Sequence, residues 1–231
     1  MLNYQVVIPA RGGSKRFPRK NVIDFFGKPL IAHTIEFALE SFSSNKIWVN
    51  TDDDEIEKIA QSYFIKTTRR PDSLGSDIAS TADVLSFQCK QFQNESILCD
   101  AIILLQATNP IRPDKLIDNC IDVFEKNNRG SLASFSKLNK KYGRIQNDYF
   151  NPKNYLPGQR MQDIVPDYFE NGLIYITKIE NLLKGEVITQ DVFPFIYNGI
   201  ESSVDIDEVD DLIYVEYVYK KKLKTFNKCI K

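Results

Sequence analysis

Short apolar runs alternate along this chain with longer segments whose apolar residues recur at helical spacing. The runs predict strands at 5–8, 46–50, 101–105, 131–136 and 172–176. The periodic segments predict helices over 29–41, 80–93, 114–127 and 208–222, and another helix after an acidic cap at 51–54. Strands that alternate with helices favour a mostly parallel sheet covered by helices on both faces. We therefore predict an α/β fold.

The run 101–105 is continuously apolar, which is typical of a central strand buried on both faces. The pattern weakens between residues 137 and 168, where asparagine, lysine, tyrosine and proline are frequent. A structureless connection of this length is uncommon in a compact domain unless it has a function. We expect one domain, residues 1–231, in which 137–168 forms an extension with a binding or oligomer-forming role.

Charge argues against one broad class of function. The 231 residues carry 30 basic and 31 acidic side chains, a formal net charge of −1. Such a balance does not attract nucleic acid over the whole surface, so any anion site must be local. A nucleic-acid-binding module would have to use the basic residues of 137–144 and 220–224. No recognisable nucleic-acid-binding motif accompanies them, which weakens this alternative.

Cysteine usage and hydropathy indicate the setting. The four cysteines, Cys89, Cys99, Cys120 and Cys229, are scattered without a Cys-x-x-Cys pair. We therefore expect reduced thiols and a cytoplasmic protein. No apolar stretch of about 18 residues is present, so neither a membrane span nor a signal peptide is predicted. The single histidine, His33, lies in an apolar helical pattern and is expected to pack rather than to catalyse.

A dense group of cations follows the first predicted strand directly. Five basic residues lie between positions 11 and 20, after a glycine pair at 12–13. Glycines let a backbone approach an anion closely, and open α/β sheets bind ligands at the carboxyl ends of their strands. The pattern is neither a P-loop nor the dinucleotide Gly-x-Gly-x-x-Gly motif. We interpret it as a cradle for a nucleoside triphosphate, in which Arg11, Lys15 and Lys20 neutralise phosphates.

Two carboxylates near the end of the chain form a second candidate site. Asp205 and Asp207 are two residues apart, so on a strand both side chains would point to the same face. Paired oxygen ligands of this kind suit Mg²⁺, or Mn²⁺, which bridges to substrate phosphates. The alternative is that Asp207 caps the predicted helix at 208, although capping leaves Asp205 unexplained.

Several motifs taken together resemble the acylneuraminate cytidylyltransferase family, also called CMP-sialic acid synthetases. The matching segments, in chain order, are 11–15, 20–21, 27–30, 50–52, 70–71, 105–110, 171–175 and 205–207. The resemblance implies a Rossmann-like three-layer α/β/α fold of the nucleotide-diphospho-sugar transferase type, with a small dimerisation extension. It also implies that CTP and a sugar acid give a CMP-sugar and pyrophosphate, by in-line attack of the anomeric hydroxyl on the α-phosphorus.

The same resemblance implies roles for individual residues. The nucleotide site would comprise Ala10, Arg11, Gly12, Gly13, Ser14, Lys15, Lys20, Asn21, Arg70, Ser80 and Thr81. The sugar acid would bind Gln106, Arg160, Gln162, Asn171 and Tyr175. The candidate catalytic residues are Arg11 and Lys15, on the leaving pyrophosphate, and Asp207, beside the metal. Without the resemblance, Ser80 and Thr81 would be interpreted as helix caps.

At one segment the chain departs from the family. The family pattern Gln-Pro-Thr-Ser-Pro is replaced by Gln-Ala-Thr-Asn-Pro at 106–110. This leaves open a sister specificity for pseudaminic, legionaminic or 3-deoxy-octulosonic acid. The resemblance further implies a homodimer in which 137–168 reaches the partner's sugar pocket. A third reading is a relative that binds nucleotide without turnover, but the phosphate-binding cations and both aspartates are present.

Overall fold

The computed structural model describes residues 2–75 and 79–229, and in them seven strands form one sheet. The strand order is β11 (Phe193–Ile196), β7 (Ser131–Leu138), β10 (Asp167–Lys178), β6 (Ala101–Leu104), β1 (Tyr4–Pro9), β4 (Ile47–Thr51) and β5 (Lys66–Arg69). Neighbouring strands run parallel except at β10, which is antiparallel to both β6 and β7. The prediction of a mostly parallel α/β sheet is confirmed.

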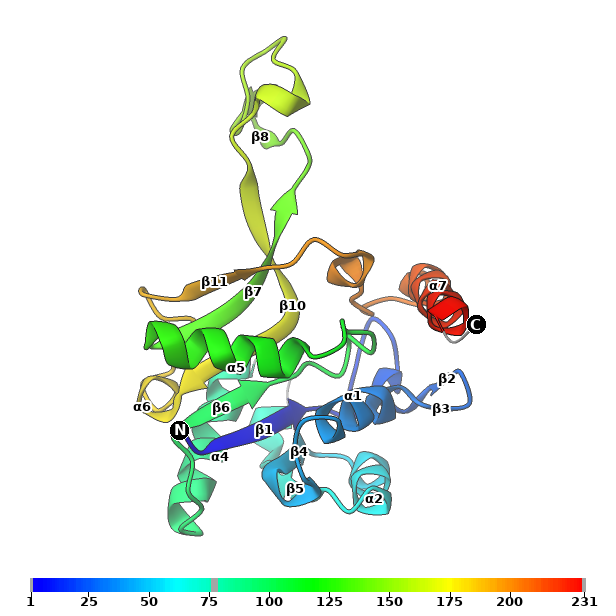
Figure 1. Ribbon diagram of the computed structural model, residues 1–231, viewed down its shortest axis with the longest axis vertical. Coiled ribbons are helices and arrows are strands. Elements are labelled where there is room, and N and C mark those ends of the chain that lie inside the picture. Colours follow the sequence, from blue (N-terminus) through cyan, green and yellow to red (C-terminus); the bar gives the residue numbers. More distant parts are fainter. Residues whose placement is uncertain (1, 76–78, 230–231) are drawn as a thin grey trace.

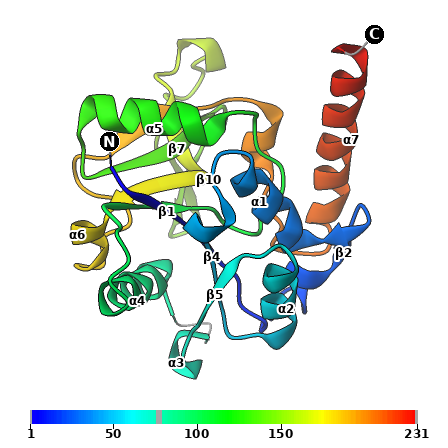
Figure 2. The same cartoon turned by 60° about the horizontal axis from the view of Figure 1, so that its bottom comes forward.

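Helices cover both faces of this sheet, as Figure 2 shows for α5 on one side and α4 and α6 on the other. Val6 and Ile8 of β1 point into a core shared with α1 (Leu30–Leu39), α2 (Asp54–Ser62) and α5 (Leu116–Asn127). Val7, between them, points to the opposite core, shared with α4 (Thr81–Asn94) and α6 (Ile179–Leu182). Because successive side chains of a strand alternate, one apolar run is buried on both faces.

The sequence pattern missed several short elements. The strands β2 (Asp24–Phe25), β3 (Lys28–Pro29), β5 and β11 were not predicted, nor were η1 (Lys20–Val22), η2 (Ser44–Lys46), α3 (Asp72–Gly75) and η4 (Ile200–Ser203). Strands β5 and β11 are the two edges of the sheet, so neither needs the continuous apolar run that reveals a central strand. The helix expected over 208–222 is α7 (Asp211–Cys229). The structure describes no side chains from residue 224 onward, so the expectations for Lys224 and Cys229 lie outside the described residues.

The segment expected to extend from the domain projects away from the sheet (Figure 1). The outer ends of β7 and β10 lead into it, and it contains the hairpin β8 (Gly143–Gln146) and β9 (Tyr149–Pro152) and the turn η3 (Met161–Asp163). We call residues 139–166 the arm. Its weak periodicity hid two strands, because an isolated hairpin has no core face to bury. In the described part of the chain, no helix is both long and apolar enough to cross a membrane.

Candidate active site

Two adjoining cavities meet at the turn after β6, the first beside the carboxyl ends of β1 and β5 and the second beside β10. The first has a volume of about 280 Å³ and the second of about 510 Å³, and Gln106 lines both. The first cavity is lined by six residues predicted for the nucleotide site: Arg11, Ser14, Lys20, Asn21, Arg70 and Thr81. The second is lined by Gln106, Asn171 and Tyr175 of the predicted sugar site and by Asp205 of the predicted metal site. The fold therefore brings residues from distant motifs together around the turn that follows the central strand β6.

Five residues predicted for the nucleotide site do not line the first cavity: Ala10, Gly12, Gly13, Lys15 and Ser80. Ala10 is buried, and its N–H donates to the carbonyl oxygen of Asn50 at 3.0 Å. Ser80 is the N-cap of α4, where its hydroxyl and the Asp83 carboxylate form a capping box. The alternative interpretation of Ser80 as a helix cap is thus confirmed, while Thr81 next to it does reach the cavity.

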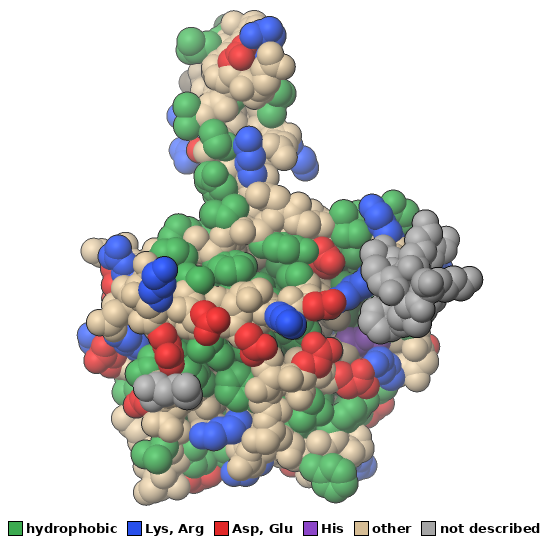
Figure 3. All heavy atoms as spheres, viewed as in Figure 1, with side chains coloured by type: hydrophobic (Ala, Val, Ile, Leu, Met, Phe, Trp, Pro, Cys, Tyr) green, Lys and Arg blue, Asp and Glu red, His purple; other side chains and the backbone are tan. Residues whose placement is uncertain are grey.

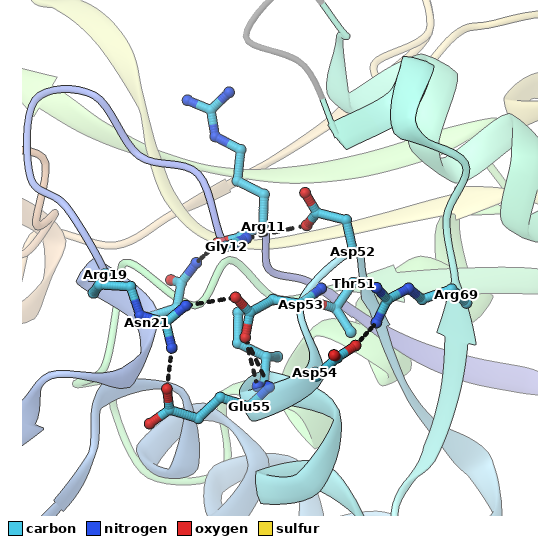
Figure 4. A network of polar contacts seen from close by, with 11 residues as sticks. Arg11, Gly12, Arg19, Asn21, Thr51, Asp52, Asp53, Asp54, Glu55 and Arg69 are labelled. Atoms are coloured by element: carbon cyan, nitrogen blue, oxygen red, sulfur yellow. Dashed lines mark hydrogen bonds and ion pairs between the residues drawn. The ribbon is translucent and has the colours of Figure 1, made fainter.

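An acidic cluster at the start of α2 holds the cationic loop in place (Figure 4). The Gly12 N–H donates to Asp52 Oδ1 at 3.0 Å, and Arg19 donates to Asp53 Oδ2 at 2.5 Å. Asp53 also caps α2, as predicted, by accepting from the N–H groups of Glu55 and Ile56. A Cβ on Gly12 would lie 2.8 Å from that of Asp53, so only glycine fits here.

Two side chains of the first cavity carry buried polar atoms without a partner. The Asn21 amide donates to the carbonyl oxygen of Arg11 at 2.9 Å, but its Oδ1 accepts nothing. The Arg70 guanidinium donates to the carbonyl oxygen of Asn50, while its Nε has no acceptor. Burial lowers the pKa of Arg70. Because buried polar groups almost always have hydrogen-bond partners, these two atoms can each take a polar partner from a molecule in the cavity.

Asp207 lies between two cations of the loop. Lys20 Nζ donates to Asp207 Oδ1 at 3.0 Å, and Arg16 Nη2 donates to Asp207 Oδ2 at 2.6 Å. Burial alone would raise the pKa of Asp207, but the hydrogen bonds and charges of Lys20 and Arg16 outweigh it and hold that pKa below its usual range. Asp207 therefore stays ionised at neutral pH.

The segment around Asp205 differs from the prediction. Residues 204–207 form no strand, because the chain here follows the turn after β6, to which the Ile206 N–H donates at Thr108. Asp207 does not cap α7 either; the Asp211 carboxylate instead accepts from the N–H groups of Asp207 and Glu208, at 2.7 Å each. Burial in the recess raises the pKa of Asp205, and the nearby charge of Asp207 adds to the rise, opposed by a hydrogen bond from Thr108.

The chemistry of Asp205 and Asp207 fits a divalent cation. Both supply hard oxygen donors, and the raised pKa of Asp205 reflects a carboxylate that a cation would stabilise. Among the described residues, no group of three or more histidine, cysteine, aspartate or glutamate side chains could hold a metal ion. Mg²⁺ often takes only one or two carboxylates and completes its shell with water and substrate phosphates. Two aspartates beside a cationic loop are compatible with this requirement.

Two predicted sugar-site residues lie elsewhere in the chain. Arg160 and Gln162 belong to the arm and line neither cavity. Arg160 is largely exposed and forms an ion pair with Asp163 at 2.8 Å. They therefore do not meet Gln106 of their own chain, because the arm directs them away from the sheet, and their predicted place in a partner's sugar pocket stays a prediction. His33, as expected, is buried, and its Nε2 lies 2.7 Å from the carbonyl oxygen of Phe25.

Sequence reasoning missed four residues that shape the site. Asp52 entered only through the matching segment 50–52 and the helix cap 51–54, and Asp53 only through that cap, although three consecutive aspartates after a strand were a signal for more. Arg112 is fully buried beneath the turn after β6, and no pattern distinguishes it from a surface arginine. Asn109 stands where the chain departs from the family pattern, which was the available signal.

Comparison with known proteins agrees with this geometry. The family model described as cytidylyltransferase matches residues 5–225. The pseudaminic acid cytidylyltransferase of Campylobacter jejuni serotype O:2 is 32% identical over 225 residues, covering 93% of this chain and 95% of that protein. The N-acylneuraminate cytidylyltransferase of Streptococcus agalactiae serotype III is 32% identical over 219 residues, covering 90% of this chain and 51% of that protein. The chain thus spans about half the length of the streptococcal relative.

Solved structures agree on the fold. The CTP complex of CMP:2-keto-3-deoxy-manno-octonic acid synthetase aligns with a TM-score of 0.71 at 20% identity, covering 95% of this chain and 99% of that one. A 4-diphosphocytidyl-2C-methyl-D-erythritol synthase aligns with a TM-score of 0.68 at 11% identity over the same shares. These likenesses confirm the predicted three-layer fold. Because the family model spans nearly the whole chain and the C. jejuni relative is matched over most of both lengths, the chain belongs to the cytidylyltransferase family, as its motifs predicted.

Proposed function

We propose that this chain is a nucleotidyltransferase that activates a nonulosonic, sialic-acid-like sugar acid with CTP, releasing pyrophosphate. One observation carries the proposal: the two cavities adjoin and share Gln106, so two substrates would lie side by side at the strand ends. The first cavity presents cations and unpartnered amide and guanidinium atoms, whereas the second presents polar neutral and acidic groups. Family membership and the names of its relatives support the same reaction.

On the nucleotide side, the chain supplies charge and hydrogen bonds. Arg11 and Lys20 would neutralise the triphosphate, and Lys15, exposed on the same loop, would join them on the leaving pyrophosphate. Asn21 Oδ1 and Arg70 Nε would meet polar atoms of the nucleotide, which would end their lack of partners. Phosphoryl-type transfers depend mostly on positioning and charge neutralisation, and these residues provide both.

On the metal side, Asp205 and Asp207 would hold Mg²⁺ or Mn²⁺. Such an ion, when bound, neutralises phosphate oxygens and lowers the pKa of a coordinated hydroxyl. Lys20 and Arg16 would meanwhile hold Asp207 ionised and in place, since both contact it directly. The sugar acid would lie in the second cavity against Gln106, Asn171 and Tyr175.

The second cavity lacks a cation of its own, which supports a dimer. None of its described lining residues is lysine or arginine, and Glu170 and Asp205 are acidic, so a sugar carboxylate would meet no positive charge. The arm bears exposed arginine and lysine and a set of exposed apolar side chains: Tyr142, Ile145, Tyr149, Phe150, Leu156, Met161 and Val165. Figure 3 shows hydrophobic and basic side chains together on this projection. We propose that the arm crosses to a second copy and that Arg160 supplies the missing charge.

The cysteines bear on the cellular setting. Cys89, Cys99 and Cys120 are free, and burial raises the pKa of Cys89 and of Cys99 to about 12. Inert, unpaired thiols support a place in the reducing cytoplasm.

A pyrophosphate-release assay identifies which sugar acid is the substrate. CTP and Mg²⁺ are offered with N-acetylneuraminic, pseudaminic, legionaminic and 3-deoxy-octulosonic acids in turn. Relatives of about equal identity bear the names of the first three, so identity alone does not choose among them. We expect turnover of at least one nine-carbon acid and little of the eight-carbon one. Reaction of the eight-carbon acid alone would contradict the proposed substrate class.

A further inference from the structure

A buried arginine lies beneath the two cavities without lining either. The Arg112 side chain is 2% exposed and donates from Nε to the carbonyl oxygen of Leu173 at 2.8 Å and from Nη2 to that of Gln106 at 2.7 Å. Its Nη1 donates to Thr34 Oγ1 at 3.2 Å and to the carbonyl oxygen of Asn109. These acceptors include no carboxylate. Burial lowers the pKa of Arg112 to about 9.

A buried guanidinium without a counterion is costly, so its contacts indicate what it stabilises. Two of its acceptors are the carbonyl groups at either end of the turn 106–109, which follows β6. A third, at Leu173, belongs to β10 directly after Gly172. Arg112 therefore ties the turn that presents Gln106 to the strand that forms the second cavity.

Asn109 continues this connection toward the metal side. It is fully buried, and its Nδ2 donates to the carbonyl oxygen of Val204. The neighbouring Thr108 carbonyl accepts from the N–H of Ile206 at 3.0 Å. The residues on both sides of Asp205 are thus bonded to the turn. The position of this carboxylate follows from the position of Asn109 and Thr108.

Asn109 also packs against Gly172, a residue that lines the second cavity. A Cβ on Gly172 would lie 3.2 Å from Asn109 Oδ1 and 2.8 Å from Gln106 Oε1. Gly172 has φ 71°, a conformation that favours glycine, so its backbone sits directly against both amides. Asn109 Oδ1 has no hydrogen-bond partner. The Asn109 amide therefore contacts Gly172, which lines the second cavity, and donates to the carbonyl oxygen of Val204, which precedes Asp205.

We propose that Asn109 and Arg112 form a positioning unit that sets Gln106 and Gly172 of the sugar cavity relative to Asp205. This inference rests on the proposed function, which assigns the second cavity to the sugar acid and Asp205 to the metal ion. The contacts of Asn109 and Arg112 do not depend on that assignment. The family pattern has serine where this chain has Asn109. The tie to Val204 thus depends on a residue in which this chain departs from its family.

The test replaces Asn109 by leucine, which has nearly the same size but cannot donate to Val204. The matched control is Thr177→Val, which removes another buried side-chain donor to a loop carbonyl, that of Val187 at 2.5 Å, near the carboxyl end of β10, at a residue that lines neither cavity. We expect Asn109→Leu to raise the KM of the sugar acid about tenfold while the Kd of CTP changes less than about threefold. Amide hydrogen exchange at Ile206 should accelerate in Asn109→Leu and stay unchanged in Thr177→Val.

The possible results distinguish a positioning role of Asn109 and Arg112 from a purely structural one. If Asn109→Leu and Thr177→Val both merely lower the Tm by similar amounts, without a change in the sugar KM or in exchange at Ile206, the positioning role is wrong. Should Asn109→Leu fail to fold, Asn109→Ala removes the same donor with a smaller side chain. Arg112→Lys, which keeps the charge and some donors, should show a partial rise in the sugar KM. If the wild-type chain turns over no sugar acid, the proposed function fails, and exchange at Ile206 still decides the positioning role.

Discussion

Lys20 donates a hydrogen bond of 3.0 Å to Asp207, which lies 187 residues later in the chain. The loop that lines the first cavity and the carboxylate proposed to hold the metal ion are therefore one electrostatic unit. Lys20 is largely buried and also lines the first cavity, whereas Arg16, which shares Asp207, is largely exposed. The two cations can be separated by mutation.

We expect Lys20→Gln to weaken CTP binding by about ten- to a hundredfold, because a buried charge-assisted contact to phosphate is lost. Arg16→Gln removes the other cation on Asp207 and serves as the matched control. It should change the Kd less than about threefold, since exposed ion pairs contribute little. Calorimetric titration with CTP measures both. Equal losses in the two variants would assign the effect to Asp207 instead of to the cavity.

The glycine pair gives a second comparison within the same loop. Gly12→Ala would push a Cβ against the Asp53 side chain, whereas a Cβ on Gly13 meets no atom within 4 Å. We expect Gly12→Ala to lower the Tm and to abolish measurable CTP binding, because the added Cβ would push the cationic loop away from Asp53 at the start of α2. Gly13→Ala should leave both quantities nearly unchanged. Thermal unfolding and CTP titration of the pair check this, and indistinguishable variants would contradict the described loop.

How far the sequence predicted this site differs from residue to residue. Arg11, Asn21 and Gln106 follow directly after strands or within the loop, and strand ends converge in a parallel sheet, so their meeting was predictable. The pairing of Lys20 with Asp207 was not, since it depends on where the segment before α7 crosses the sheet. The same-face argument for Asp205 and Asp207 assumed a strand, which this segment does not form; two acidic residues around a buried isoleucine mimic alternation.

Acid should destabilise the fold partly through Asp53. Burial opposes ionisation of this carboxyl, but hydrogen bonds from the α2 backbone and from Arg19 outweigh it and lower its pKa. A lowered folded-state pKa adds stability that is present above the ordinary value and is lost as the pH falls toward the folded value. Between about pH 5 and pH 3, wild type should therefore lose more of its unfolding free energy than Asp53→Asn, which still caps the helix. Urea unfolding across this range gives the comparison, and parallel curves would count against it.

The proposed dimer can be tested by complementation. Lys20→Gln leaves the arm intact but disables the first cavity, and Arg160→Ala does the reverse. If Arg160 acts across the interface, mixing the two weak variants should restore turnover, since half the sites of a mixed dimer hold both residues. Adding Ile145→Glu to each should prevent the restoration, whereas Ile213→Glu, at 74% exposure against 76% for Ile145, should not. Without restoration on mixing, Arg160 does not act from the partner.

The arm also marks the limit of sequence reasoning. No residue of the arm is fully buried within the chain, so neither period of hydrophobic spacing appears and the β8–β9 hairpin was missed. Arg112 was missed for the opposite reason. It lies in a position whose neighbours are carbonyl groups brought together only by the fold, and no local pattern announces them. His33, by contrast, is buried as its apolar helical pattern indicated.

The central claim is that the first cavity takes CTP and the second an α-keto sugar acid. The most direct measurement follows product formation by ³¹P NMR with a nonulosonic acid, Mg²⁺ and each of CTP, UTP and ATP. We predict a CMP-sugar phosphodiester and equimolar pyrophosphate with CTP alone. Product from UTP or ATP but not from CTP would contradict the account.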